Sequence, residues 1–168
     1  HLSLRRQRQM CIRDRVEAIS IEDLNNLDAL HLTAAPIEDR DIEALASPLS
    51  GLNALMTLSL TGTSIGNKGA RAIAASDTVL ANLLHLSLVG TFVDSDAVRI
   101  IASPETGLKK LVLLDLTATQ VDDKGIEALA SPDSGLKSLQ LVGLSATKVS
   151  REAVESLKAA RPDLRIDY

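Results

Sequence analysis

The sequence predicts an α/β fold: a right-handed, curved solenoid with a parallel sheet on its concave face and helices on its convex face. Three observations predict it. Leucine-rich hexapeptides recur every 28 residues without insertion, as LDALHL, LMTLSL, LLHLSL, LVLLDL and LQLVGL. Within each unit the apolar spacing changes from alternation to that of a helix. Apolar residues form 45% of the chain but aromatic residues only 1%, so the core must be aliphatic.

Each unit is predicted to begin with a short strand. With Leu27 as position 1, positions 4 and 6 are apolar and alternate with outward-facing positions 3, 5 and 7, which is typical of a strand with one buried face. Positions 16, 19 and 20, for example Ile126, Leu129 and Ala130, have helical spacing. The unit is therefore a strand, a turn, a helix and a second turn.

The ends of each helix also have sequence signals. A polar residue precedes the apolar helix positions, and we expect it to be the N-cap. These residues are Asp39, Asn67, Ser95 and Asp123. The segments SPLSG, SPETG and SPDSG follow the helices and predict a helix end and a turn. We expect positive φ angles at their glycines, Gly51, Gly107 and Gly135.

A single strand and helix of this size cannot bury their apolar sides, but stacked copies can. Parallel strands lie about 4.8 Å apart, whereas helices need about 10 Å, so the stack must bend with its helices outside. Small residues at position 20 would ease helix crowding. They are Ala46, Ala74, Ala102 and Ala130.

The pattern L-x-x-L-x-L-x-x-T-x-[IV] resembles the leucine-rich-repeat family from Leu27 to the C-terminus. The repeat length and helical second half are similar to the ribonuclease-inhibitor-like class. That family usually has Asn at position 9, stacked as a ladder that bonds loop backbone. This chain has Ala35, Thr63, Thr91, Thr119 and Thr147 there, similar to repeats of environmental bacteria. A Thr hydroxyl can still bond nearby backbone, although it has one donor where Asn has two.

The repeat register predicts the organisation of the chain. VEAIS at Val16 matches IEALA at Ile42, so a half repeat is expected over 16–26. Full repeats follow over 27–54, 55–82, 83–110 and 111–138, and 139–168 forms a C-terminal cap ending in a short strand at LRIDY.

The opening segment His1–Arg15 differs from everything after it. It contains five Arg and the only Cys, and Arg5 to Asp14 match a translated transposase-adapter sequence without a gap. We interpret residues 1–15 as a non-native segment and exclude them from the fold and function arguments. The alternative is a basic arm or transit peptide. The interpretation also predicts that the native gene continues upstream.

Charge and composition exclude several classes of protein. Net charge is −4, and removing residues 1–15 leaves 13 Lys and Arg against 21 Asp and Glu, a net charge of −8. Nucleic-acid binding usually needs a basic stripe, so we expect no nucleic-acid partner. The chain contains no run of about 18 apolar residues, so the sequence predicts no membrane span. With one Cys no disulfide framework is possible, and the redox compartment stays open.

Strand positions facing away from the helices give the candidate binding surface. We expect it to include Thr57, Ser59, His85, Ser87, Val89, Leu113, Asp115 and Leu141, with Phe92 on the adjoining loop. Leu113 beside Leu141 is the best apolar candidate. Phe92 is either a partner contact or packs on its own loop.

Catalysis and metal binding find little support in this pattern. His85, Ser87 and Asp115 lie on neighbouring predicted strands, but a flat sheet has no oxyanion hole. His31 and His85 are two repeats apart, about 10 Å by strand spacing, so we expect no metal site and no cofactor.

The sequence therefore predicts a monomeric, non-catalytic module that binds a protein partner through its concave face. Two alternatives stay open. The chain is the recognition arm of a larger enzyme or effector whose catalytic domain lies upstream, or it is a structural spacer without a specific partner.

Overall fold

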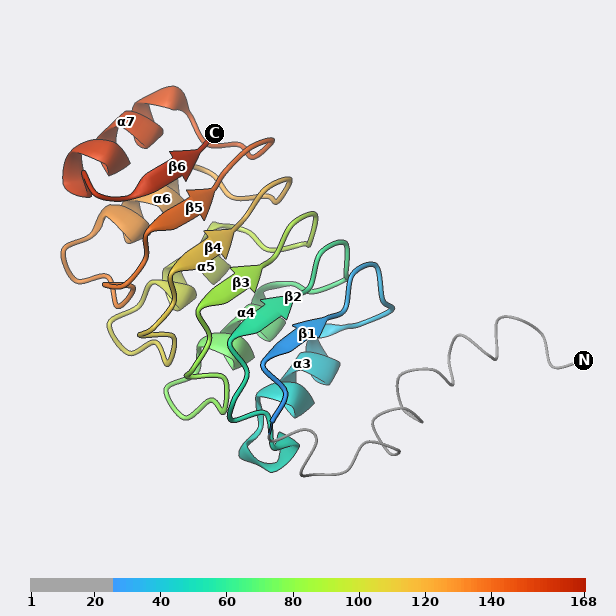
Figure 1. The fold of residues 1–168 in the computed structure, drawn as a ribbon. Coiled ribbons are helices and arrows are strands. Elements are labelled where there is room, and N and C mark those ends of the chain that lie inside the picture. Colours follow the sequence, from blue (N-terminus) through green and yellow to red (C-terminus); the bar gives the residue numbers. More distant parts are fainter. Residues whose placement is uncertain (1–25) are drawn as a thin grey trace, which may run out of the picture.

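The structure is a computed structural model that describes residues 26–168 (Figure 1). Its strands are β1 (Ala29–His31), β2 (Thr57–Ser59), β3 (His85–Ser87), β4 (Leu113–Asp115), β5 (Leu141–Gly143) and β6 (Arg165–Asp167). Its helices are α3 (Asp39–Ala46), α4 (Asn67–Ala74), α5 (Ser95–Ile101), α6 (Asp123–Ala130) and α7 (Arg151–Ala160), with a 3-10 helix η1 (Pro48–Ser50). The adapter-like segment 1–15 and nearly all of the half repeat 16–26 lie outside the described residues.

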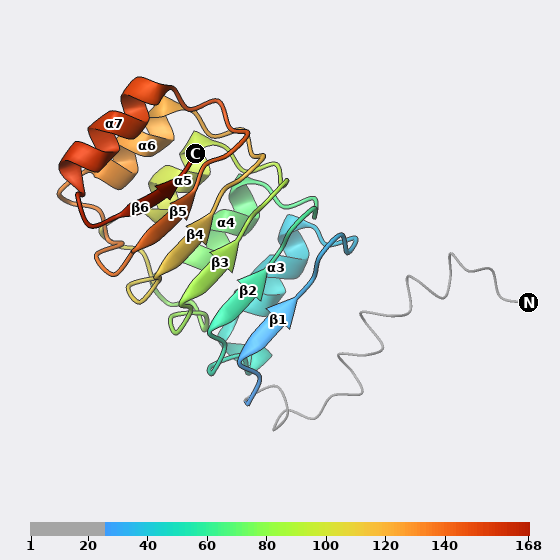
Figure 2. The ribbon, with the colours of Figure 1, turned by 45° about the horizontal axis from the view of Figure 1, so that its top comes forward.

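The strands form one six-stranded parallel sheet in the order β1 to β6. The register follows the repeat, since Leu30 pairs with Leu58, Leu58 with Leu86 and Leu86 with Leu114. Figures 1 and 2 show the sheet on one side of a curved coil and the helices on the other. The predicted α/β solenoid is thereby confirmed, as is the final strand predicted in LRIDY.

The core lies between the sheet and the helices and is aliphatic, as the composition predicts. Repeat positions 4 and 6 are fully buried in the central repeats, for example Leu86 and Leu116. Ile126 and Leu129 of α6 close the same core from the helix side. In the first repeat Leu30 and Leu32 are only partly buried.

The predicted N-caps are wrong by one residue. The caps are Glu38, Gly66, Asp94, Asp122 and Ser150, each one position before the expected residue or its equivalent. At Asp94 and Asp122 the carboxylate accepts from a backbone N–H two residues on, Asp96 and Lys124 respectively. The expected residues instead occupy the first helical position and point to the next repeat.

Those side chains form an inter-repeat ladder, which we define as the position 13 residues Asp39, Asn67, Ser95 and Asp123. Each accepts a hydrogen bond from the backbone N–H of the next repeat's N-cap. The acceptor–donor pairs are Asp39 with Gly66 (2.7 Å), Asn67 with Asp94 (3.2 Å), Ser95 with Asp122 (2.9 Å) and Asp123 with Ser150 (2.7 Å).

The position 9 threonines behave differently, because their bonds stay within one repeat. The hydroxyls of Thr63, Thr91 and Thr119 donate to the carbonyls three residues earlier at 2.6–2.7 Å. They close the turn after each strand. In this region neighbouring repeats are joined by the inter-repeat ladder and by backbone bonds such as that from the Phe92 N–H to the Ile65 carbonyl.

The prediction for glycine is correct at Gly51, whose φ is 77°, and wrong at Gly107 and Gly135, which have no positive φ. These two are required by close approach. A Cβ on Gly107 would lie 2.2 Å from the Ala75 carbonyl oxygen, and one on Gly135 would lie 2.3 Å from that of Ser103. Positive φ recurs instead at position 8, at Ala34, Gly62, Gly90, Ala118 and Ala146.

Candidate functional site

The concave surface consists of two rows of side chains on the strands. The position 3 row contains Ala29, Thr57, His85, Leu113 and Leu141, and Arg165 continues it on β6. The position 5 row contains His31, Ser59, Ser87, Asp115 and Gly143, and Asp167 continues it. The position 4 side chains between them are buried in β2 to β5 and partly buried in β1 and β6, so both rows face away from the helices.

Leu113 and Leu141 form the apolar part of the position 3 row. They are direct partners on adjacent strands, and both are half-buried. Exposed His85 lies on one side of the pair and exposed Arg165 on the other. Two leucines are thus held side by side on an otherwise weakly polar surface.

Hydroxyl groups connect the middle of the position 5 row. Thr61 lies 3.2 Å from Ser59 and 3.0 Å from Ser87, measured between the side-chain oxygens. This short chain of hydrogen bonds ties β2 to β3. Thr61 was absent from the predicted site, although its place at position 7 would have indicated it.

Asp115 owes its position to two neighbours. Its Oδ1 accepts from the backbone N–H of Thr117 at 3.0 Å. A Cβ on Gly143 would lie only 2.5 Å from the same oxygen, so the missing side chain leaves the space that the carboxylate occupies. The carboxylate therefore lies over β5, close to the Leu113–Leu141 pair.

The residues considered as a catalytic triad are not bonded to one another in the described part of the chain. Ser87 shares its hydroxyl with Thr61, and Asp115 bonds the backbone of Thr117. His85 has an exposed side chain and pairs through its backbone with Leu113. Within residues 26–168, no group of three or more His, Cys, Asp or Glu side chains is placed to hold a metal ion.

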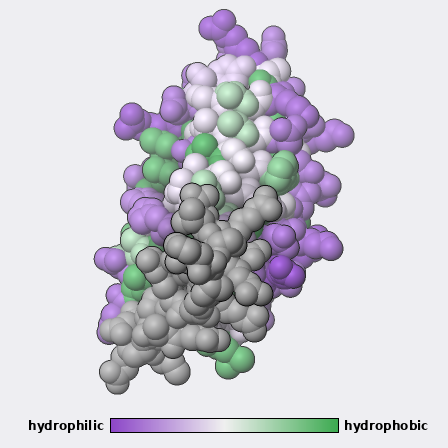
Figure 3. Space-filling view, turned by 90° about the vertical axis from the view of Figure 1, so that its right-hand side faces the viewer, coloured by the Kyte–Doolittle hydropathy of each residue, from purple (hydrophilic) through white to green (hydrophobic). Residues whose placement is uncertain are grey.

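Phe92 and Val89 lie on the loop that follows β3. Phe92 is 69% exposed, and its backbone N–H donates to the Ile65 carbonyl at 2.8 Å. Val89 is half-buried. Viewed from the side on which the strands end, a pale band of weakly polar residues lies between hydrophilic flanks (Figure 3).

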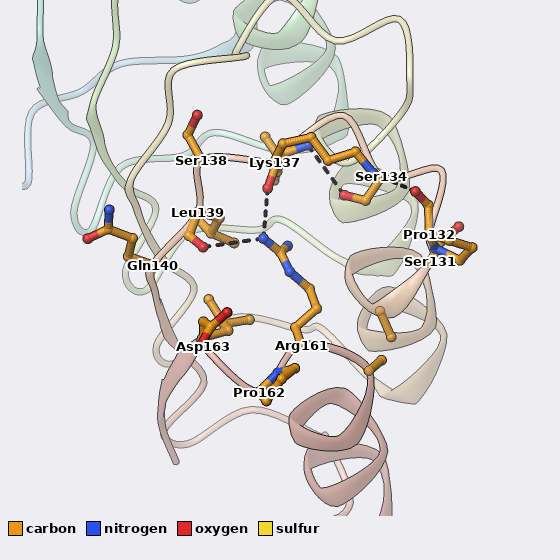
Figure 4. A pocket seen from close by; sticks show the side chains of 14 residues that line it. Ser131, Pro132, Ser134, Lys137, Ser138, Leu139, Gln140, Arg161, Pro162 and Asp163 are labelled. Carbon is orange, nitrogen blue, oxygen red and sulfur yellow. Dashed lines mark hydrogen bonds between the residues drawn. The ribbon is translucent and has the colours of Figure 1, made fainter.

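A pocket that the sequence did not indicate lies beside the last two repeats (Figure 4). Its volume is about 620 Å³, and its lining includes Ser131, Ser134, Lys137, Gln140 and Arg161. Arg161 Nη2 donates to the carbonyls of Leu136 (2.9 Å) and Leu139 (3.2 Å). The pocket precedes β5 and β6, away from the two concave rows.

No protein family is matched by the sequence, and no curated protein matches it. Several solved structures, however, match the fold of this chain. An internalin from Listeria monocytogenes superposes with a TM-score of 0.53 at 19% identity, over 88% of this chain and 36% of the internalin. The tropomodulin C-terminal domain of Caenorhabditis elegans gives a TM-score of 0.58 at 14% identity, over 91% of this chain and 92% of that domain.

The fold is a leucine-rich-repeat solenoid. A leucine-rich-repeat protein from Leptospira interrogans also matches, at 22% identity and a TM-score of 0.46, over 88% of this chain and 38% of that one. This chain thus spans little more than a third of the bacterial proteins. Among residues 26–168, no helix has the length and apolar character needed to cross a bilayer.

Proposed function

We propose that this leucine-rich-repeat chain is a non-catalytic module that binds a protein partner through its concave surface. The sheet has one face packed on the helices, while the rows at positions 3 and 5 carry no covering element among the described residues. A curved parallel sheet offers a wide surface for a folded partner.

The observation that carries the proposal is the half-buried Leu113–Leu141 pair with the Asp115 carboxylate beside it. Interfaces concentrate their binding energy in a small apolar centre surrounded by polar groups. Here the centre is the leucine pair, and the surrounding groups are His85, Ser87, Asp115 and Arg165. Thr57 and Ser59 extend the surface toward β1. Phe92, exposed on the adjoining loop, supplies an aromatic contact to the same partner.

The test is photo-crosslinking with a reactive amino acid at position 113, compared with the same group at position 49. Leu49 is 96% exposed in η1, far from the concave rows, and serves as the matched control. We expect a partner that crosslinks at position 113 and not at position 49. Leu141→Asp should weaken binding of this partner at least tenfold, whereas Leu49→Asp should leave binding unchanged. Equal crosslinking at both positions, or unchanged binding by Leu141→Asp, would contradict the proposal.

We also propose a class of leucine-rich repeat and an oligomeric state for this chain. We place the chain in the ribonuclease-inhibitor-like class because its 28-residue repeats each carry an α-helix after the strand. We also propose that it is monomeric in solution. Light scattering at several concentrations tests this, and a mass that doubles with concentration would contradict it.

A further inference from the structure

We propose that the pocket beside the last two repeats binds a phosphate group, either free or carried by a small molecule. This pocket, defined by Ser131, Ser134, Lys137, Gln140 and Arg161 in its lining, has a volume of about 620 Å³. Small-molecule sites typically have volumes of about 300–1,000 Å³. The site is separate from the concave surface, so its test is independent of the proposed function.

The Arg161 guanidinium has no counter-ion among residues 26–168. No carboxylate of the described chain lies within 4.0 Å of it, and Nη1 is buried without an acceptor. Burial lowers the pKa of Arg161 from its ordinary value. The guanidinium is partly buried and its only described partners are the neutral carbonyls of Leu136 and Leu139, so an anion in the pocket would supply the missing counter-charge.

The rest of the lining offers donors for such an anion. Lys137 Nζ donates to the Pro132 carbonyl, which leaves two of its three N–H groups. The hydroxyl oxygens of Ser131 and Ser134 accept from backbone N–H groups, so their O–H groups stay available as donors. Figure 4 shows Arg161 directed toward the segment that carries Lys137, Ser138 and Leu139.

The lining also contains one carboxylate, that of exposed Asp163, against the two cations Lys137 and Arg161. The balance is positive in a chain that is acidic as a whole. Guanidinium and ammonium groups with hydroxyl donors are the groups that proteins use for phosphate. We therefore infer a phosphate in preference to a halide, which needs no such array of donors.

The experiment measures thermal unfolding and calorimetric binding of the full chain with inorganic phosphate and with glycerol phosphate, against sodium chloride of equal ionic strength. With the phosphate probe at about 20 times its dissociation constant, we expect the unfolding midpoint to rise by about 4–7 °C. Tighter binding of glycerol phosphate would support a phosphorylated small molecule, and equal binding would support the free ion. No shift with either probe would overturn the proposal.

Three variants test whether phosphate binds in this pocket. Lys137→Glu is expected to lose the shift, whereas Lys109→Glu is expected to keep it. The two lysines are matched, because each donates from Nζ to a proline carbonyl five residues earlier in its own repeat, but only Lys137 lines the pocket. Equal loss in both variants would show general charge attraction and overturn the proposal. Arg161→Met is a second variant, expected to abolish calorimetric binding; if it does not fold, the lysine pair still decides.

Discussion

Asp122 is the N-cap of α6, and Ser95 of the preceding repeat holds its carboxylate. The Ser95 hydroxyl donates to Asp122 Oδ1 at 2.5 Å and also accepts from the Asp122 backbone N–H at 2.9 Å. This side-chain bond is the largest cause that lowers the pKa of Asp122 below its ordinary value of 3.8, with smaller contributions from Lys124 and Gly125. One hydroxyl thus links two repeats and favours a charged carboxylate at a helix N-terminus.

We predict that Ser95→Ala raises the pKa of Asp122 and changes how stability depends on pH. Because the native pKa is lowered, Asp122 stabilises the fold above pH 3.8 and loses that contribution as pH falls through its native pKa. Because solvent screens this largely accessible carboxylate, the variant should be less stable than the wild type by about 1 kcal/mol at pH 7, and by less at pH 3.

Urea unfolding at both pH values and an NMR titration of the Asp122 carboxyl group measure these effects. Ser156→Ala is the control, since the Ser156 hydroxyl also donates a hydrogen bond, to the Glu152 carbonyl, but its side chain is exposed on α7 and bonds no carboxylate. An Asp122 titration that is identical in the wild type and Ser95→Ala would contradict the prediction.

At the scale of the element, the strands and helices could be predicted because every repeat has the same spacing of apolar residues. The alternation around Leu86 and Leu114 fixes which side chains are buried, and hence that Leu113, Asp115 and Leu141 share the concave surface. Helix starts were harder to predict. Two polar residues adjoin at most of these starts, as in Asp122-Asp123, and only the neighbouring repeat decides which one caps its own helix.

Contacts that occur once could not be predicted from the repeat pattern. Arg161 occupies repeat position 23, where the other repeats have Leu49, Asp77, Glu105 and Asp133. Its bonds reach the carbonyls of Leu136 and Leu139, which are distant in sequence and are defined only by the folded chain. Similarly, the role of Gly143 could not be predicted, because it depends on the Asp115 carboxylate occupying the space that a Cβ would fill.

The turns provide a prediction at this scale. Gly135 ends the turn after α6 and has no positive φ. A Cβ added there would lie 2.3 Å from the Ser103 carbonyl oxygen. Gly90 has a φ of 64°, but the nearest atoms to its Cβ lie at 4.0 Å. We predict that Gly135→Ala destabilises the fold by about 3 kcal/mol through overpacking, and Gly90→Ala by about 1 kcal/mol through backbone strain.

Equilibrium unfolding in urea compares these two substitutions directly. Ala118 and Ala146 already occupy the repeat position of Gly90 with similar φ angles, so that position tolerates a methyl group. Gly135 also donates its N–H to the Ala102 carbonyl at 2.8 Å, and a displaced turn would weaken that bond. A larger loss for Gly90→Ala than for Gly135→Ala would contradict the argument from close approach.

At the scale of the whole molecule, the extensive contacts of each repeat within residues 26–168 are with its sequence neighbours. The helices pack in sequence, α3 on α4, α4 on α5, α5 on α6 and α6 on α7, and the strands pair in the same order. Stability is then a sum of repeats and of the interfaces between them. The same residue type at the same repeat position should therefore contribute differently according to how many neighbours cover it.

Leu114 and Leu30 test this, because both occupy position 4 of their repeats. Leu114 is fully buried between β3 and β5, whereas Leu30 is partly buried and its strand pairs only with β2 among the described residues. Truncating a buried leucine costs about 2–5 kcal/mol, and the cost rises with the cavity that remains. We predict a loss of about 4 kcal/mol for Leu114→Ala and about half of that for Leu30→Ala, measured by urea unfolding. Leu86→Ala, with neighbours on both sides, should match Leu114→Ala. Equal losses at positions 30 and 114 would contradict the prediction.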